Sequence, residues 1–175
     1  VGQVGGDGVL LENLRLTFKV AKTTKPSENT LEAKIYNLSP DTRAKLREPD
    51  TVILLHAGYV QDTGEQLLFS GDLTRVHHEE AAADAATTIE CGDGHKALRD
   101  TRISESWGAG TKAADVIRQL AGSLQVGVEK IVGVEGSYPN GLSVSGLVKD
   151  AMDSVANLAG VDWSIQDGKL LALPP

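Results

Sequence analysis

Apolar and polar residues alternate in short runs over the first hundred residues, and these runs predict strands. In Leu14-Arg15-Leu16-Thr17-Phe18-Lys19-Val20 every second residue is apolar, as in a strand with one buried face. Further strands are expected at 31–36, 66–79 and 86–91. The run at 51–59 is almost continuously apolar, which predicts a strand covered on both faces. An antiparallel barrel or small sandwich is the natural closure of such strands.

A short helix is predicted at 40–47, between two of these strands. Ser39 is a good N-cap because its hydroxyl can accept a hydrogen bond from a free backbone N–H. Pro40 fits the first helical position, where no donor is needed, and Asp41 suits the positive end of the helix dipole. Pro49 disfavours helical geometry in the residue before it, so the helix should end ahead of it.

Beyond residue 100 the apolar spacing becomes that of helices. Thr111 can cap a first helix. Its apolar positions are Ala113, Ile117, Leu120 and Leu124. A second helix is predicted from about Ser145, with Gly160 as the glycine that follows it. Its apolar positions are Val148, Ala151, Met152, Val155, Leu158 and Ala159.

The whole pattern predicts an α+β, β-rich fold of two domains. An antiparallel β-barrel or split-barrel domain is expected at 9–97, followed by a smaller α+β domain with two helices at 98–175. This second domain should end in a hairpin, because Gln166-Asp167-Gly168 separates two apolar runs. The Gly-rich residues 1–8 are expected to form a flexible amino end. No internal repeat is apparent.

Composition and charge narrow the function classes. The chain has 175 residues, of which 41% are hydrophobic, enough for one large or two small domains. Its net charge of -7 argues against a free nucleic-acid binder or a membrane-surface protein, since both need an excess of Lys and Arg. The single Cys91 excludes an internal disulfide and fits a reducing compartment. We expect neither a membrane-spanning segment nor a signal peptide.

A series of short segments resembles a known family. In chain order the segments are LRLTFKVAKT, NTLEAKIYNLSPDTRAKL, VILLHAGY, LLFSGDLTRVHHE, TTIECGDGHKAL, GTKAADVIRQLA and VDWSIQDGKLLAL. This series is similar to the N-terminal part of baseplate hub proteins of contractile-tailed bacteriophages, the late control protein D or tail hub class. The resemblance covers Leu14 to Leu173 and lies in the order and spacing of IYNLSPDTR, AGY, FSGD and GDG.

The resemblance implies a structural component of a phage tail baseplate, the central hub that joins tail tube to spike. It implies a trimer when intact, with other hub subunits and the tube and spike proteins as partners. It implies no enzymatic activity, no cofactor, and no nucleic-acid or membrane partner. The implied location is the baseplate of the virion, after assembly in the host cytoplasm. Hub proteins continue into a further barrel, so we expect one beyond Pro175, and the chain alone should be monomeric or weakly associated.

Three loops are the candidate partner contacts, because the first barrel of a hub resembles tube subunits and joins a ring through edges and loops. The loops are 21–29, 60–65 and 80–86. The candidate contact residues are Thr24, Lys25, Gln61, Asp62, Ala81, Ala82 and Ala83. The three alanines have little side chain to hold a turn, so a neighbour would have to supply the burial that offsets their ordering entropy.

Four residues suggest zinc, since Cys and His are its usual ligands. They are His77, His78, Cys91 and His95. His77 and His78 are adjacent in a predicted strand and should point to opposite faces. If the strands pair around the 80–85 turn, Cys91 lies opposite Thr74, about 10 Å from His77. Four ligands do not converge in that arrangement, so we expect no metal site.

Patterns typical of enzymes have ordinary structural explanations. Cys91 and His95 could form a nucleophile and base, but the apolar strand around Cys91 favours a buried thiol. The carboxylates Asp72, Glu79 and Glu80 could serve a glycosidase, but carboxylates at strand ends and turns are normally solvated. A tail-associated peptidoglycan-processing enzyme remains an alternative.

A glycine-rich segment suggests a second alternative, a nucleotide- or ligand-binding α+β module. Gly108-Ala109-Gly110-Thr111-Lys112 opens a predicted helix, yet a phosphate-binding loop needs the order Gly-Lys-Ser/Thr. The residues before it lack the apolar run of a central parallel strand. A linker with a helix cap is therefore expected, and Trp107 and Trp163 are expected to anchor the core of this domain.

Overall fold

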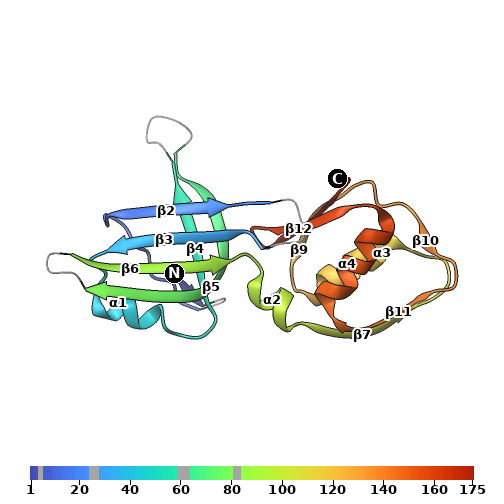
Figure 1. Cartoon of the computed structure of the whole chain (residues 1–175), viewed down its shortest axis with the longest axis horizontal. Coiled ribbons are helices and arrows are strands. Elements are labelled where there is room, and N and C mark those ends of the chain that lie inside the picture. The colour runs from blue at the N-terminus through green and yellow to red at the C-terminus, as the bar shows by residue number, and fades with distance from the viewer. Residues whose placement is uncertain (4–5, 24–27, 59–63, 81–83) are drawn as a thin grey trace. The chain divides into compact units, whose positions relative to one another are not determined.

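The structure is a computed structural model that describes residues 1–3, 6–23, 28–58, 64–80 and 84–175 (Figure 1). It forms two compact units. Unit 1 comprises Val1–Lys22 and Asn29–Asp93, and unit 2 comprises Thr23–Glu28 and Gly94–Pro175. The predicted α+β, β-rich fold class is confirmed.

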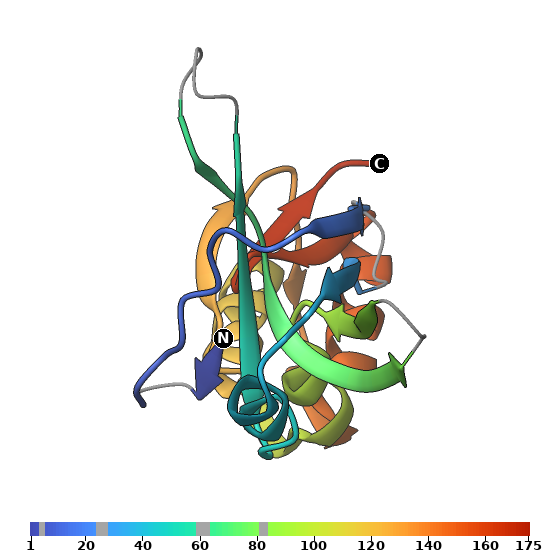
Figure 2. The same ribbon diagram turned by 90° about the vertical axis from the view of Figure 1, so that its left-hand side faces the viewer.

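Unit 1 is a six-stranded antiparallel sheet in the order β1-β4-β5-β6-β3-β2. Its strands are β1 (Gly2–Gln3), β2 (Leu16–Ala21), β3 (Thr30–Tyr36), β4 (Thr51–Ala57), β5 (Gln66–Glu80) and β6 (Ala85–Gly92). The strands curve around an interior (Figure 2). Within the described residues β1 and β2 end the sheet and do not pair with each other, so the sheet is open. Gly2 and Gln3, expected in a flexible amino end, pair with Val52 and Thr51.

The core of unit 1 lies on one face of this sheet, which we call the inner face. It contains Leu31, Ala33, Ile35, Ile53, Leu55, Phe69, Ile89 and Cys91, with Leu38 and Leu46 from the helical segment. Phe69 is fully buried at its centre. A Cβ atom at Gly71 would lie 2.7 Å from Phe69 Cζ and 2.7 Å from the carbonyl oxygen of Gly92. Only glycine fits beside this ring.

The helix α1 (Pro40–Lys45) begins as predicted. The Ser39 hydroxyl accepts a hydrogen bond from the backbone N–H of Thr42 at 3.1 Å, and Pro40 occupies the first turn together with Asp41. The helix ends at Lys45, slightly earlier than predicted, with Leu46 as its C-cap. Leu46 is buried in the core of unit 1. Local capping chemistry therefore places the helix that packs Leu46 into this core.

The prediction that the strand at 51–59 is covered on both faces is wrong. In β4 the side chains of Ile53 and Leu55 are buried, but Leu54 is 54% exposed and His56 is also exposed. Only the inner face is covered, because no described element packs over the other side of β4 at these positions.

In unit 2 the two longest helices pack between small sheets (Figures 1 and 2). Its helices are α2 (His95–Asp100), α3 (Ala113–Ser123) and α4 (Val148–Ala159). Its strands are β7 (Arg102–Trp107), β8 (Thr111–Lys112), β9 (Gly127–Ile131), β10 (Ser137–Tyr138), β11 (Leu142–Leu147), β12 (Asp162–Gln166) and β13 (Lys169–Leu173). β7 pairs with β11 and β8 with β10, both antiparallel. The third sheet has the order β12-β13-β9, with β9 parallel to β13.

Three details of the helical predictions are wrong. Lys112 rather than Thr111 is the N-cap of α3, because Thr111 is in β8 and its hydroxyl donates to the carbonyl of Gly108. α4 begins at Val148, since β11 continues to Leu147. Leu158 is 73% exposed, and Ala156 is buried instead. The predicted hairpin of β12 and β13 is confirmed, with Asp167 and Gly168 both at positive φ.

Unit 2 contains a repeat that the sequence did not reveal. β7, α3 and β9 follow one another in the same order as β11, α4 and β12, except that the short β8 lies between β7 and α3. The five buried residues of α4 occupy the same relative positions as the five of α3. Both helices end alike: Val126 N–H donates to the Ala121 carbonyl at 3.2 Å, and Val161 N–H donates to the Ala156 carbonyl at 3.1 Å. Four of these five residues differ between the two helices, so the spacing is shared more than the residues themselves.

The two helix ends give a matched stability prediction. Gln125 and Gly160 hold equivalent left-handed positions, with φ of 58° and 68°. Replacing Gly160 by alanine should lower the free energy of unfolding by about 1 kcal/mol, because a Cβ is strained in this region. The change Gln125→Gly should raise it by a few tenths to ~1 kcal/mol. Urea denaturation checks both, and effects of the same sign would contradict the expectation.

Candidate interaction surface

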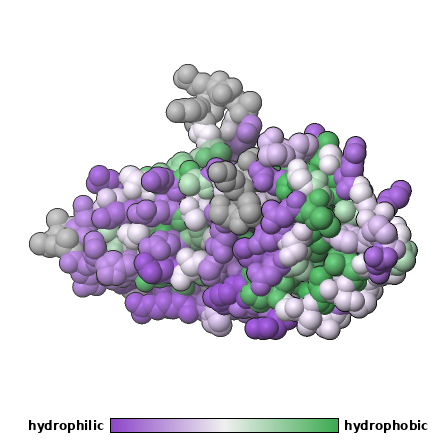
Figure 3. All heavy atoms as spheres, turned by 45° about the vertical axis from the view of Figure 1, so that its right-hand side comes forward, coloured by the Kyte–Doolittle hydropathy of each residue, from purple (hydrophilic) through white to green (hydrophobic). Residues whose placement is uncertain are grey.

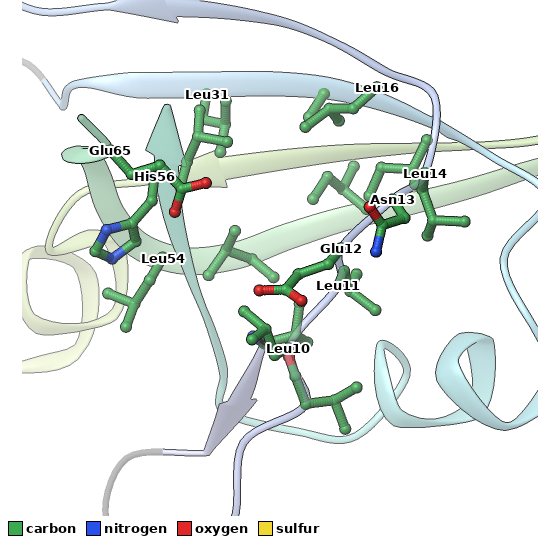
Figure 4. Close-up of a pocket in the computed structure, with 17 residues that line it drawn as sticks. Leu10, Leu11, Glu12, Asn13, Leu14, Leu16, Leu31, Leu54, His56 and Glu65 are labelled. Atoms are coloured by element: carbon green, nitrogen blue, oxygen red, sulfur yellow. Dashed lines mark hydrogen bonds between the residues drawn. The ribbon is translucent and has the colours of Figure 1, made fainter. Parts of the chain in front are cut away.

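A cavity of about 690 Å³ opens on the inner face of the sheet in unit 1 (Figure 4). Its floor is formed by core residues of β3, β4 and β6: Leu31, Ala33, Ile35, Ile53, Leu55 and Ile89. Its rim consists of Leu16 on β2, Leu54 and His56 on β4, Glu65, and the segment Val9–Leu14. The cavity is thus the incompletely filled interior of an open sheet.

β2 turns an uncovered apolar face toward this cavity. Leu16, Phe18 and Val20 pair with Ile35, Ala33 and Leu31 of β3, so they share the inner face with these core residues. The predicted alternation is correct, but the predicted burial is not. Leu16 is 39% and Phe18 is 44% exposed, and only Val20 is half-buried. The cause is that β2 has β3 on one side and no described strand on the other.

β4 offers the second open strand edge. β1 covers it only at Thr51 and Val52. From Ile53 to Ala57, β4 pairs with β5 alone among the described residues. Free edges that carry apolar side chains are templates for strand addition by another chain, and proteins normally protect them. Two such edges border one apolar cavity in unit 1.

The charges of the two edges have opposite signs. Glu12 and Glu65 stand at the rim of the cavity, and none of the residues that line it is Lys or Arg. β2 carries Lys19, and Arg15 precedes it with its guanidinium 4.6 Å from the centre of the Tyr36 ring. The β2 edge is therefore basic, whereas the rim of the cavity is acidic, with Glu65 on its β4 side.

The seven contact residues predicted from the sequence lie outside the described residues. Thr24 and Lys25 fall in 24–27, Gln61 and Asp62 in 59–63, and Ala81, Ala82 and Ala83 in 81–83. They stay predictions. The surface above comes instead from strand residues that the sequence analysis did not select.

The zinc candidates are separated. His78 is largely buried, with Nδ1 3.0 Å from the Thr87 hydroxyl and Nε2 against Arg43. His77 is 63% exposed beside Glu79, so the two histidines do point to opposite faces. A bulge between Leu73 and Arg75 puts Cys91 opposite Leu73, not opposite Thr74 as predicted. In the described part of the chain no three His, Cys, Asp or Glu side chains group as metal ligands would.

Cys91 and His95 have separate structural roles. His95 belongs to unit 2, and its Nδ1 lies 2.8 Å from the Glu28 carboxylate. Cys91 is in the core of unit 1. Burial, together with the negative charges of Asp72 and Glu90, raises the pKa of the Cys91 thiol from its ordinary 9.0 to about 12. A thiol that stays protonated at neutral pH is a poor nucleophile.

The raised pKa gives a direct prediction for Cys91. Near pH 8 its thiolate fraction should be roughly 10³-fold smaller than in the unfolded chain, since the pKa rises from 9.0 to about 12. We expect labelling by a disulfide reagent at least ~100-fold slower in the native protein than in urea. The unfolded chain loses this proton above pH 9 and the folded chain keeps it, so stability should also fall as pH rises through this range. Equal native and unfolded labelling rates would contradict both points.

The glycine-rich segment is not open for phosphate. The N–H of Gly110 donates to Tyr138 at 2.8 Å, and that of Thr111 donates to Gly108 at 3.3 Å. The first N–H of α3, at Ala113, donates to Gly136 at 3.1 Å. A phosphate cradle needs such groups free. The segment instead ties β8 to β10.

The remaining candidates are also structural. Glu79 lies 3.9 Å from Lys34, and Glu80 is 77% exposed beside Arg43. Trp163 is buried, as predicted for a core anchor, and its indole N–H donates to Asp153 at 2.8 Å. Trp107 packs against the same core and is only half-buried. None of the helices in the described ranges is long and apolar enough to cross a membrane.

Unit 2 also shows apolar atoms at its surface (Figure 3). Its exposed large apolar residues are Val128, Val132 and Leu158. Val128 lies in β9, at one end of the three-stranded sheet, and Leu158 lies in α4.

Two solved structures share this fold. A tail protein from Neisseria meningitidis MC58 matches 89% of the chain with a TM-score of 0.60 and 15% sequence identity. The 43 kDa tail protein of prophage MuSo2 from Shewanella oneidensis matches 92% of the chain with a TM-score of 0.63 and 9% identity. The chain has the fold of these tail proteins. It covers 44% and 50% of their lengths, so it spans about half of each.

Sequence comparison adds no relative. No family model matches the chain, and no curated protein does. At 15% and 9% identity the two structures establish the fold, and function has to be argued from the surface described above.

Sequence reasoning missed the exposed apolar residues around the cavity. They are Leu10 and Leu54, which are 78% and 54% exposed. One signal was available: His56 interrupts the apolar run of β4 on the same side as Leu54. No sequence signal marks Leu16 and Phe18 as exposed, because their alternation is that of a half-buried strand.

Proposed function

We propose that this chain is a structural component of a phage tail, and specifically part of a central baseplate hub that joins the tail tube to the spike. The observation that carries this proposal is the fold shared with two tail proteins over about nine-tenths of the chain, 89% and 92%. The order of short segments typical of hub proteins supports the more specific role.

The chemistry of the chain supports a structural rather than an enzymatic role. Burial raises the pKa of the Cys91 thiol to about 12, and the backbone donors of the glycine-rich segment are already bonded. Two open strand edges beside an apolar cavity suit contact with protein. Surfaces of this kind mark sites of protein association.

The more specific features of the proposal follow from the hub resemblance. The intact protein would be a trimer in the virion baseplate, assembled in the host cytoplasm, with tube and spike proteins as partners. Its tube-like domain would span 9–97 and its α+β domain 98–175. The seven loop residues named from the sequence would add contacts to a ring.

A chain-terminating mutation tests the proposed function. A stop codon early in the gene, in a phage that encodes this chain, should give particles without complete tails and no plaques on a non-suppressing host. The wild-type gene supplied from a plasmid should restore both. Normal tails in electron micrographs of the mutant would refute a structural tail role. Peptidoglycan clearing by the purified chain, lost on Cys91→Ala, would support the enzymatic alternative instead.

A further inference from the structure

The open sheet of unit 1 leaves two complementary strand edges unpaired. Among the residues that the structure describes, no strand pairs with the outer edge of β2, where Leu16 and Phe18 are exposed, or with the edge of β4 from Ile53 to Ala57. We propose that β2 of one copy pairs with this edge of β4 in a second copy, so that the sheet continues from chain to chain. This contact rests on the proposed tail role, since it supplies the joint between subunits.

The pairing would cover the apolar groups that a single copy leaves exposed. Leu16 and Phe18 lie on the inner face of the sheet, as do Ile53 and Leu55 on β4. Adding β2 beside β4 keeps these side chains on one face, because neighbouring residues of a sheet share a face in register. The side chains of Leu16 and Phe18 would then close the mouth of the cavity in the next copy.

The charges favour this particular pairing. The incoming β2 carries Arg15 and Lys19 beside its apolar residues. On the β4 side, the mouth of the cavity carries Glu65. Opposite charges across strands stabilise their pairing, whereas like charges oppose it. Pairing β2 with a second β2, or β4 with a second β4, would bring like charges together.

A second copy fits better than closure of the same chain. Val9–Leu14 joins β1, which lies beside β4, to β2, and it lines the cavity between them (Figure 4). Leu11 of this segment packs against the core. The segment would have to leave the core before β2 could reach β4 of its own chain. The part of the mouth lined by Leu54, His56 and Glu65 lies away from this segment (Figure 4).

Such a contact is head-to-tail, because two different surfaces meet. After one contact, the first copy keeps its β4 edge and the second copy keeps its β2 edge for further neighbours, so the contact forms a ring if its rotation closes. One strand pair is a small interface, so association of the isolated chain should be weak and best seen by trapping.

Cross-linking between separately purified variants tests the pairing. Thr17 on β2 and Leu54 on β4 both lie on the face opposite the inner face, so the proposed pairing brings them together. Thr17→Cys and Leu54→Cys variants are mixed and oxidised at micromolar concentration, and the buried Cys91 is left in place. A disulfide-linked dimer should form roughly tenfold faster or more than with the control pair Thr17→Cys and Leu158→Cys, because docking raises the local thiol concentration. Leu158 is a suitable control because it is 73% exposed in unit 2. A second pair, Thr17→Cys and His56→Cys, covers another register.

Reversing the charges of Lys19 and Glu65 tests whether the cross-link depends on the proposed pairing of β2 with β4. Lys19→Glu in the Thr17→Cys chain should slow the cross-link severalfold, and Glu65→Lys in the Leu54→Cys chain should restore the rate. Cross-linking no faster than the control in both pairs overturns the proposal. Faster linking of Thr17→Cys to itself also overturns it, since that outcome means a symmetric contact.

The outcomes separate this inference from the proposed function. Tails lost with the stop codon but no specific cross-link would leave the tail role standing and refute the strand pairing. A specific cross-link with normal tails in the stop-codon mutant would refute the tail role and leave the pairing as a property of the chain.

Discussion

Replacing Phe69 by alanine should lower the free energy of unfolding of unit 1 by about 3–5 kcal/mol, the range for a fully buried aromatic residue. Phe69 is 0% exposed in the core. The same replacement at Phe18, which is 44% exposed on β2, should cost only about 1 kcal/mol. These are the only two phenylalanines of the chain, so the pair compares equal side chains in one sheet.

Circular dichroism during urea denaturation measures this difference. Both tryptophans, Trp107 and Trp163, belong to unit 2, so their fluorescence reports unit 2 while circular dichroism reports both units. The Phe69→Ala change should therefore appear in circular dichroism. Similar losses for the two variants would mean that Phe18 is a core residue and that β2 has no free apolar face.

A change at Phe18 should affect assembly of the tail more than folding of the isolated chain. A charged residue at Phe18 should leave the isolated chain folded, because the side chain is already 44% exposed. In the complete tail protein the same change should block assembly if β2 joins a neighbouring subunit. Normal assembly with Phe18→Glu would argue against any role of β2 in subunit contact.

Replacing Trp163 by alanine should lower the free energy of unfolding of unit 2 by about 3–5 kcal/mol. Trp163 is 2% exposed, and its indole N–H donates to Asp153 Oδ1 at 2.8 Å. Asp153 Oδ2 also accepts from Lys149 at 2.8 Å. Trp163→Phe should cost less, about 1–3 kcal/mol, because it keeps most of the packing and leaves Asp153 with one donor fewer.

The remaining Trp107 serves as the fluorescent reporter in both Trp163 variants. Trp107→Phe is the matched control, because this ring is only half-buried at the edge of the same core. Asp153→Asn should resemble Trp163→Phe, since it weakens the same bond. Equal losses for Trp163→Ala and Trp163→Phe would show that the hydrogen bond outweighs packing at this site.

Elements that depend on local chemistry could be predicted from the sequence. Ser39 and Pro40 fix the start of α1 through one side-chain bond and one fixed φ. Asp167 and Gly168 at positive φ fix the last hairpin in the same way. In each case the cause lies within a few residues of the effect, so the sequence pattern carries it.

Features that depend on distant neighbours could not be predicted. Leu54 and Leu55 are both leucines and are adjacent in the chain. The packing of β4 in the sheet exposes Leu54 and buries Leu55. The bulge between Leu73 and Arg75 moves the register of Cys91 and has no marker in the sequence. Leu158 fits the apolar spacing of α4, but its side chain is exposed, whereas Ala156 is buried and Ala159 packs against the core.

The candidate surface also combines a feature that the sequence predicts with one that depends on distant neighbours. The alternation that predicts β2 is clear in the sequence, but it cannot tell whether the apolar face meets the protein's own core or another subunit. That distinction depends on β2 being the last strand of an open sheet. An exposed strand face and its acidic counterpart beside β4 become visible only when the strand order is known.

Cryo-electron microscopy of the complete tail of a phage that encodes this chain tests the central claim most directly. We predict density for unit 1 at the tail tip, arranged around the tail axis as a trimer, with β2 hydrogen-bonded to β4 of a neighbouring subunit. A tail without this protein, or one in which unit 1 joins its neighbours through other surfaces and leaves both edges in solvent, would contradict it.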